Sequence, residues 1–98
     1  MKNLFQQLDK AFENKIRLGI MSVLRVNSNL SYTQLKDTLD VTDGNLASHL
    51  KYLEKVNYIT VSKSFIERKP NTDYAISPKG KAAFEKHINT LEDILKNL

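Results

Sequence analysis

Residues 31–55 have the sequence SYTQLKDTLDVTDGNLASHLKYLEK, and this stretch decides the fold. It contains two helix starts. Ser31 and Gln34 have the spacing of a capping box, in which each side chain bonds the backbone amide of the other residue. Thr42 is a favourable N-cap, and Asp43 places a negative charge where the helix dipole favours one. We therefore predict two helices joined by a turn of only a few residues.

The second of these helices, predicted over residues 43–56, has two different faces. Leucines recur at steps of four and three residues, which indicates a narrow apolar stripe. At about 100° per residue, the opposite face is small and polar. The stripe consists of Leu46, Leu50 and Leu53, and the polar face consists of Gly44, Ser48, Lys51 and Lys55. Asn57 follows the helix and suits the left-handed conformation in which many helices end. The stripe predicts packing on a core, and the polar face is free to contact a partner.

The residues after this helix predict a β-hairpin. Residues 58–66 are rich in β-branched and aromatic types with alternating polarity, which indicates a strand with one buried face. Residues 67–71 form a basic, turn-like loop, and residues 72–76 are typical of a returning strand. The tip of the hairpin is therefore charged. Its cations are Lys63, Arg68 and Lys69, within a predicted wing over residues 63–72.

Two longer helical segments flank this central part. Apolar residues recur at three- and four-residue steps through residues 1–26, with a break allowed at Asn14. Ser77 and Pro78 open a last helix that runs to about Lys96. The order helix, helix, helix, hairpin, helix predicts a mainly α fold with a small β-hairpin (α+β), a winged helix-turn-helix. We expect a single domain over residues 1–98.

Composition limits the functions that are open to the chain. It has 98 residues, a formal net charge of +4 and no cysteine, so disulfides and thiolate metal sites are excluded. The two histidines have no spaced partners, and there is no nucleophile–base pair or glycine-rich phosphate loop, so we expect no metal, no other cofactor and no enzyme activity. No N-terminal stretch resembles a signal peptide, and no run is long enough to cross a bilayer. We expect a cytoplasmic protein without a membrane partner.

A helix with a small polar face and nearby cations suits the major groove of double-stranded DNA. Taken alone, such a face is more often only a solvated surface, but the order of the elements favours DNA. Asn45 can pair with adenine, the helix lysines can reach phosphates or guanine, and an arginine of the hairpin can enter a narrow minor groove. The candidate DNA contacts are Ser31, Thr42, Gly44, Asn45, Ser48, His49, Lys51, Tyr52, Lys55, Lys63, Arg68 and Lys69. For His49, a half-buried structural role is the favoured interpretation, and a contact to the DNA backbone is the second.

Several segments resemble winged-helix regulators of the MarR and ArsR type, in particular a compact, stand-alone MarR-like subgroup. The matching segments are IRLGIM at 16–21, YTQL at 32–35, TDGNLASHLKYLE at 42–54 and KSFIERKPNTDYAIS at 63–77, followed by Gly80. The resemblance implies sequence-specific binding of double-stranded DNA, usually by a homodimer, and regulation of prokaryotic genes. By position, it implies a DNA face made of Thr42, Gly44, Asn45, Ser48, His49 and Lys51, with Arg68 and Lys69 in the wing. The cysteines and the spaced His/Asp pair of metal-sensing relatives are absent, so metal sensing is not implied.

The terminal helices carry more apolar residues than a core of this size needs. At 1.5 Å per residue the last predicted helix is about 28 Å long, and its apolar positions continue almost to the end of the chain. We expect this surplus to form a homodimer interface, because exposed helix ends normally fray unless they are docked. Its residues would be Leu4, Phe5, Leu8, Phe84, Ile88, Leu91, Leu95 and Leu98. A two-fold dimer predicts a near-palindromic operator.

A winged-helix protein–protein interaction module that binds no DNA is the alternative function. Such a module exposes apolar anchors, for which Tyr52 and Phe65 are the candidates. The clustering of cations beside a small polar helix face favours DNA. The sequence leaves open the operator, the direction of regulation and any small-molecule effector.

Overall fold

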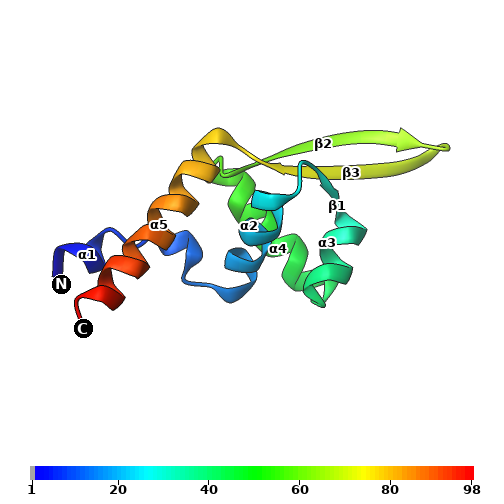
Figure 1. The fold of residues 1–98 in the computed structure, drawn as a ribbon. Helices are drawn as coiled ribbons and strands as arrows, with labels where there is room; N and C mark the ends of the chain where they lie inside the picture. Colours follow the sequence, from blue (N-terminus) through cyan, green and yellow to red (C-terminus); the bar gives the residue numbers. More distant parts are fainter. Residues whose placement is uncertain (1) are drawn as a thin grey trace.

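The computed structural model describes residues 2–98 and confirms the predicted winged helix-turn-helix (Figure 1). Three antiparallel strands form one small sheet in the order β1-β3-β2, and the helices pack below and beside it. The elements are α1 (Lys2–Gln6), the 3-10 helix η1 (Lys10–Phe12), α2 (Lys15–Val26), β1 (Leu30–Ser31), α3 (Tyr32–Leu39), α4 (Asp43–Lys55), β2 (Ile59–Ile66), β3 (Lys69–Ile76) and α5 (Pro78–Lys96).

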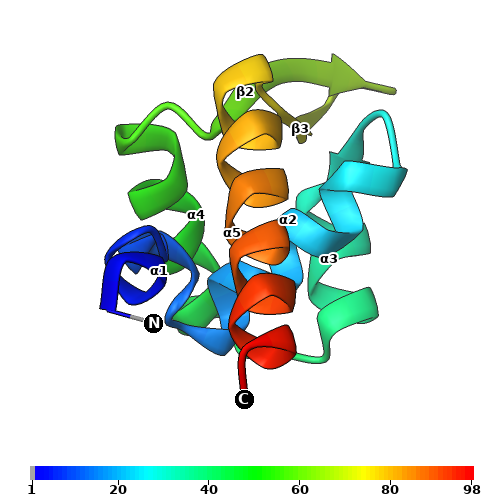
Figure 2. The same cartoon turned by 60° about the vertical axis from the view of Figure 1, so that its left-hand side comes forward.

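The molecule is elongated, with principal extents of 54, 25 and 21 Å. The β2–β3 hairpin, which we call the wing, projects from the body at one end, and both ends of the chain lie at the other (Figure 1). There, α1 lies against α5 of the same chain, and α5 runs across the front of the helical body (Figure 2). The two regions for which we predicted function, the wing with its helix and the terminal helices, are therefore well separated.

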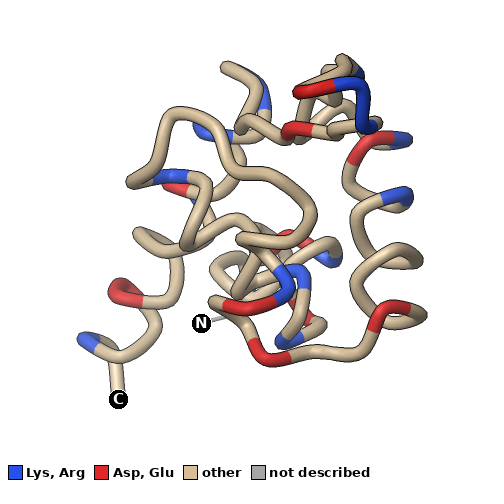
Figure 3. The backbone as a smooth tube through the Cα atoms, turned by 90° about the vertical axis from the view of Figure 1, so that its right-hand side faces the viewer, with Lys and Arg blue, Asp and Glu red and all other residues tan. Residues whose placement is uncertain are grey.

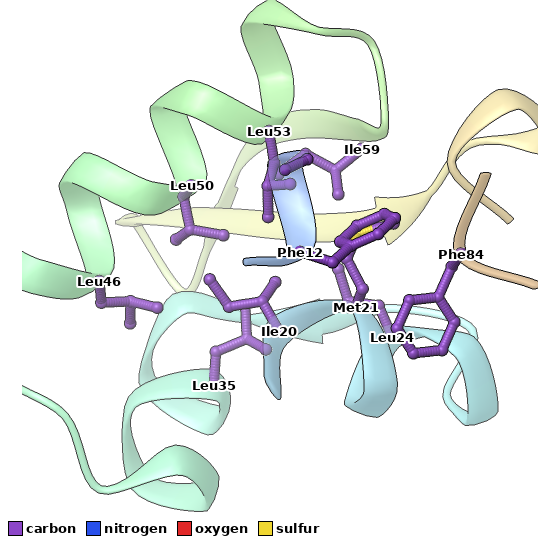
Figure 4. Packing of buried hydrophobic residues seen from close by; sticks show 11 residues of the cluster. Phe12, Ile20, Met21, Leu24, Leu35, Leu46, Leu50, Leu53, Ile59 and Phe84 are labelled. Carbon is purple, nitrogen blue, oxygen red and sulfur yellow. The ribbon is translucent and has the colours of Figure 1, made fainter. Parts of the chain in front are cut away.

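A leucine-rich core fixes α4 on the rest of the protein. The predicted stripe of α4 is buried against α2 and α3, as Figure 4 shows. Full burial of one such side chain contributes about 1.5–3 kcal/mol. The buried residues at this junction are Leu46, Leu50 and Leu53 of α4, Leu35 of α3, and Ile20, Met21 and Leu24 of α2. Because the stripe is narrow, the opposite face of α4 stays in solvent, as predicted.

The N-terminal helical segment is divided at two places. The break allowed at Asn14 is confirmed: its side-chain oxygen caps α2 by accepting from the amides of Ile16 and Arg17, at 2.9 and 3.1 Å. A second break, which the apolar spacing did not predict, separates α1 from η1. There Asp9 caps the start of η1, and its carboxylate accepts from the amide of Ala11 at 2.9 Å. Met1, part of the predicted segment, lies outside the described residues.

The wing is longer, and its turn tighter, than predicted. β2 and β3 pair from Ile59 opposite Ile76 out to Ile66 opposite Lys69, so the loop predicted over residues 67–71 is wrong. Only Glu67 and Arg68 form the turn, with φ angles of 51° and 67°. Two consecutive left-handed residues are typical of the hairpin turn whose twist matches the strands. Such turns usually contain Asn or Gly, which explains why the sequence did not reveal this one.

A short strand at the start of α3 has no counterpart in the prediction. Leu30 pairs with Tyr74 and Ser31 with Asp73, so β1 ties the base of the wing to the helix-turn-helix. A strand of two residues is too short to show an alternating pattern. At the far end of α4, the helix stops one residue before the predicted boundary, and Asn57 adopts the predicted left-handed conformation with φ 64°.

Candidate nucleic-acid interface

Local hydrogen bonds set the two helix starts as the sequence predicts. The Ser31 hydroxyl accepts from the amide of Gln34 at 3.2 Å, and the Gln34 side chain accepts from the amide of Ser31 at 2.9 Å. Thr42 Oγ1 accepts from the amide of Asn45 at 3.3 Å and caps α4. Between the helices, Asp40 takes a left-handed conformation with φ 52°. The turn therefore needs only a few residues, and the start of α4 is fixed relative to α3.

A second set of contacts holds the N-terminus of α4 from the side. The Tyr32 hydroxyl donates to the backbone oxygen and to Oδ1 of Asp43, both at 3.1 Å, and Lys36 Nζ lies 3.1 Å from Oδ2 of Asp43. The hydrogen bond from Lys36, and after it that from Tyr32, lowers the pKa of Asp43. The carboxylate is thus satisfied by α3, and its charge is partly neutralised beside the predicted DNA face.

The outer face of α4 is exposed and free of large side chains near its start. Gly44, Asn45 and Ser48 are all exposed, and a methyl group placed on Gly44 would meet no atom within 4 Å. Lys51 and Lys55 continue this face toward the C-terminal end of the helix, and both are exposed. The face that the sequence predicts for DNA is therefore an open surface that is polar at one end and cationic at the other.

The wing adds cations next to this face. Lys63, Arg68 and Lys69 are exposed, and Figure 3, which views the molecule from the wing side, shows basic positions on both α4 and the wing. Val61 and Lys63 both contribute to a groove shared with α4, so this face of β2 is the one turned toward the helix. Strand alternation places Phe65 on the same face, nearer the tip.

An open groove of about 500 Å³ separates α4 from the wing. Lys51 and Lys63 supply cations from its two sides, and Tyr32 and Tyr74 supply phenol groups. Burial, followed by the neighbouring Tyr32 and Glu54, raises the pKa of Tyr74, so its hydroxyl is a neutral donor. The lining residues are Tyr32, Ala47, Ser48, Leu50, Lys51, Glu54, Val61, Lys63 and Tyr74. The Tyr32 hydroxyl already donates to Asp43, so Tyr74 supplies the hydroxyl donor that remains. A groove with cations on both sides and such a donor suits one strand of a phosphate backbone.

The sequence did not point to the two tyrosines or to Glu54 as groove residues. The sequence places Tyr32 in the first helix of the helix-turn-helix and Tyr74 in the returning strand of the hairpin. They meet only because β3 returns past the start of α3, which is a property of the tertiary fold. Glu54 brings a negative charge into the groove that Lys51 and Lys63 also line.

The other flank of α4 contacts α2 through Arg17, a residue that the sequence did not single out. Arg17 Nη1 lies 3.3 Å from His49 Nδ1, and the guanidinium carbon lies 4.1 Å from the centre of the Tyr52 ring. His49 is half-buried, as its favoured interpretation predicted. Burial, followed by the charge of Arg17, lowers the pKa of His49. No local pattern reveals such a contact, because Arg17 and His49 are far apart in the sequence.

The predicted dimer residues fall into three environments. Phe84 is only 5% exposed and packs edge-on against Phe12, so it belongs to the core of the protomer and offers no surface for a partner. Three further residues are half-buried, because α1 and α5 already cover one another in part. These are Leu4, Leu8 and Ile88. The exposed ones are Phe5, Leu91, Leu95 and Leu98.

Other kinds of site are missing from the part of the chain that the structure describes. Within residues 2–98, no three His, Asp or Glu side chains come close enough to hold a metal ion. In the same range, no helix combines the length and the apolar character that a membrane span requires.

Comparison with known proteins agrees with this geometry. The profile of the winged helix DNA-binding domain matches residues 16–95. An uncharacterized protein of Methanocaldococcus jannaschii is 34% identical over 89 residues, which cover 91% of this chain and 97% of that protein. The structure of a transcriptional regulator homologue from Pyrococcus horikoshii superposes with a TM-score of 0.89 at 28% identity, covering 99% of this chain and 97% of the other.

The likeness to MarR proteins is one of fold. The apo form of MarR from E. coli superposes with a TM-score of 0.67 over 99% of this chain and 78% of its own, at 16% identity. Both the architecture and the profile match are those of DNA-binding regulators and not of enzymes. The chain belongs to the winged helix DNA-binding domain family.

Proposed function

We propose that this protein is a sequence-specific transcription regulator that binds double-stranded DNA as a homodimer. In this proposal α4 enters the major groove and the wing contacts the flanking backbone or minor groove. The observation that carries it is the outer face of α4, which is exposed, small and polar near Gly44 and Ser48 and cationic at Lys51 and Lys55. A helix of this kind can approach base edges closely and still neutralise phosphates.

The groove beside α4 supports the same docking. With α4 in the major groove, one phosphate strand would pass between the helix and the wing, where Lys51 and Lys63 face it. The wing would then extend along the flanking DNA, with Arg68 and Lys69 at its tip. The Pyrococcus horikoshii protein of similar structure is a transcriptional regulator homologue, which is consistent with this role. Such a regulator would act in the cytoplasm, where prokaryotic genomes lie.

Homodimerisation rests on the apolar residues that remain exposed on the terminal helices and at the C-terminus next to α5. Leu95 and Leu98 are 68% and 89% exposed, and Phe5 and Leu91 lie on the same pair of helices. Both helices lie at the end of the molecule opposite the wing (Figure 1). A two-fold contact there would leave both copies of α4 and of the wing free for two half-sites of one near-palindromic operator.

The alternative, a protein-interaction module, is favoured by one observation. Phe65 and Ile66, next to the wing turn, are 75% and 57% exposed. Tyr52, the other anchor named from the sequence, is half-buried and stacked on Arg17, so it is a poor anchor for a partner. The apolar tip could bind a protein, although it could equally rest against the sugars of a minor groove.

One experiment separates the two functions. The wild-type protein is incubated with a pool of random duplexes, the bound fraction is sequenced, and the affinity for the recovered consensus is measured from 50 to 300 mM salt. We expect an enriched near-palindrome and a steep fall in affinity with salt, since each neutralised phosphate adds roughly 0.9 to the slope of log affinity against log salt. No enrichment, together with no duplex binding at low salt, would exclude the DNA-binding function.

A further inference from the structure

Arg17 is held in place on three sides. Its Nε donates to the backbone oxygen of Ala11 at 2.7 Å, and Nη2 lies 3.5 Å from the backbone oxygen of Lys10. Nη1 lies 3.3 Å from His49 Nδ1, and the guanidinium plane covers the ring of Tyr52 at 4.1 Å. One cation from α2 thus fixes two side chains of α4 and connects them to the η1 segment.

This geometry decides where the proton of His49 sits. An arginine in a protein is always protonated, and its guanidinium nitrogens can only donate hydrogen bonds. Nδ1 of His49 must therefore accept from Arg17, which puts the ring proton on Nε2. Nε2 makes no hydrogen bond within residues 2–98, and it is not among the buried polar atoms that lack a partner. His49 thus presents an oriented and accessible N–H donor.

That donor lies on the flank of α4 next to the predicted DNA face. His49 follows Asn45 by one helical turn and precedes Tyr52 by nearly another, so the three residues share one side of the helix. Residues on the flank of a recognition helix face the sugar–phosphate backbone when the central face reads the bases.

We propose that Arg17 is a positioning residue of the DNA interface: it holds His49 with its proton on Nε2 and keeps the Tyr52 ring in place, so that His49 donates a hydrogen bond to a phosphate oxygen of the duplex. The inference rests on the proposed DNA-binding function. It adds Arg17 to the residues needed for binding and assigns one protonation state to His49. In the absence of DNA the phosphate is replaced by solvent, and Arg17 keeps the donor prepared for binding.

The surroundings of His49 favour a neutral donor over a cation. From α2 the charged neighbour is Arg17, whose positive charge opposes protonation of the ring. From η1, Lys10 and Ala11 present backbone oxygens to Arg17, and from α4 itself Tyr52 presents an uncharged phenol. Burial acts in the same direction as Arg17 and lowers the pKa of His49.

The first test needs no DNA and starts with the unaltered protein. Long-range proton–nitrogen NMR distinguishes protonated from unprotonated ring nitrogens of His49. We expect a proton on Nε2 and none on Nδ1 at pH 7.5, and in Arg17→Met a mixture of the two forms with a pKa closer to the ordinary value. His87 is the internal reference and should not change. A wild-type proton on Nδ1, or an identical His49 spectrum in Arg17→Met, would overturn the proposal.

The second test measures binding to the duplex that the wild-type protein selects. Loss of one hydrogen bond to a charged phosphate corresponds to about a tenfold weaker affinity, which we expect for His49→Ala at pH 8. His49→Gln keeps an N–H donor at a similar reach and should stay within about threefold of wild type. The double variant Arg17→Met/His49→Ala should be about as weak as His49→Ala, because both changes remove the same contact.

The pH dependence separates positioning from a merely structural role. In Arg17→Met, His49 is free to protonate, so affinity should recover in part between pH 8 and pH 6, whereas wild-type affinity changes less. Arg17→Met/His49→Gln, which has no ring at position 49, should lose this recovery. If wild type binds duplex DNA but Arg17→Met and His49→Ala bind equally well at both pH values, only the present inference fails. If wild type binds no duplex, the proposed function fails as well.

Discussion

Gly80, in the first turn of α5, packs directly on the backbone of Tyr58, in the connection between α4 and β2. A Cβ atom at position 80 would overlap the Tyr58 carbonyl group, lying 2.7 Å from its carbon and 2.9 Å from the Cα atom. Neighbouring hydrogen bonds fix this approach, because Ser77 donates its amide to the Tyr58 oxygen at 3.0 Å and its hydroxyl to the Asn57 oxygen at 2.7 Å. Neither backbone can retreat without breaking these bonds.

We therefore predict that Gly80→Ala destabilises the fold. Adding a methyl group to a packed site lowers the free energy of unfolding by about 1–3 kcal/mol. Here the group in contact is backbone, which can move less than a side chain. Urea unfolding followed by circular dichroism measures the loss. Lys81→Ala, at the exposed neighbouring position, is the control and should stay within about 0.5 kcal/mol of wild type. Equal stability of the two variants would show that the contact is not tight.

Gly44→Ala should have the opposite effect on stability and still weaken DNA binding. Gly44 lies in α4, where alanine favours the helix by about 0.5–1 kcal/mol, and the added methyl group meets no atom within 4 Å. The same methyl group would stand on the face that approaches base edges. Unfolding and duplex affinity are measured on the same sample. A stabilised protein with unchanged affinity for its selected duplex would place the DNA elsewhere than on this face.

Much of the fold follows from local pattern. The capping box at Ser31, the cap at Thr42 and the leucine stripe of α4 each depend on residues within one or two helical turns, so the sequence alone identifies them. The tight Glu67–Arg68 turn and the two-residue β1 were missed for different reasons. The turn has unusual residues for its conformation, and β1 is too short to show a period.

The sequence predicts the parts of the candidate site whose residues are close to one another along the chain. The exposed face of α4 and the cations of the wing follow from helical and strand periodicity. Arg17 against His49, and Tyr32 beside Tyr74 in the groove, bring together residues that are distant in sequence. Phe84 is the reverse case. Its place in the apolar repeat of α5 fitted a dimer interface, but Phe12, which follows the second helix break, packs against it within the same chain. Only the tertiary fold decides such pairs.

Substitutions in α4 and in the wing should affect DNA binding in different ways. Asn45→Ala and Ser48→Ala remove groups from the face that reads bases, so discrimination between selected and random duplexes should fall by about 1–3 kcal/mol for each lost base contact. Arg68→Ala and Lys69→Ala should weaken binding to all duplexes by similar factors and reduce the salt dependence. Competition titrations with both kinds of duplex measure this. The assignment of roles is wrong if the wing variants change sequence preference and the helix variants do not.

Stability should decrease as the pH falls below about 6.5, the ordinary value for histidine. His87 is buried, its Nδ1 accepts from the amide of Asp9 at 3.0 Å, and protonation would remove this acceptor. Burial lowers the pKa of His87, although Asp9 and Glu13 oppose the shift. A histidine with a lowered pKa in the folded state binds protons less readily there than when unfolded. Its contribution is therefore complete above the unfolded value and is lost as the pH falls toward the folded value.

Urea unfolding between pH 5.5 and 7.5 measures this dependence. Each histidine of lowered pKa adds at most about 1.4 kcal/mol per pH unit to the slope. His49 has a lowered pKa too, so His87→Asn should remove part of the slope and His87→Asn/His49→Gln more of it. Asparagine at position 87 can still offer an acceptor oxygen to Asp9, so the variant should fold. Parallel stability curves for wild type and His87→Asn would mean that His87 titrates alike in both states.

Homodimer formation should show directly in the mass of the protein in solution. α1 already packs on α5 within one chain, and Ile94 is buried there, so the ends of the protomer are partly covered. The group of large apolar side chains that remains in solvent consists of Phe5 of α1, Leu91 and Leu95 of α5, and Leu98, which follows α5. A second copy that buries this group removes it from water at about 25 cal/mol per Å². We therefore expect sedimentation at micromolar concentration to give twice the protomer mass of 11.2 kDa.

Leu91→Asp and Leu95→Asp should return the protein to the monomer, because an unpaired carboxylate cannot be buried at low cost. Val26 is also a large, exposed apolar residue, but it lies at the end of α2, so Val26→Asp is the matched control and should keep the dimer mass. A monomer contains only one α4 and can therefore contact only one half-site. It should therefore bind an operator with two half-sites about one helical turn apart roughly a hundredfold more weakly than the dimer does, and bind a single half-site no more weakly. A wild-type monomer at micromolar concentration, whose mass and operator affinity are unchanged by Leu91→Asp, would show that the terminal helices serve only their own protomer.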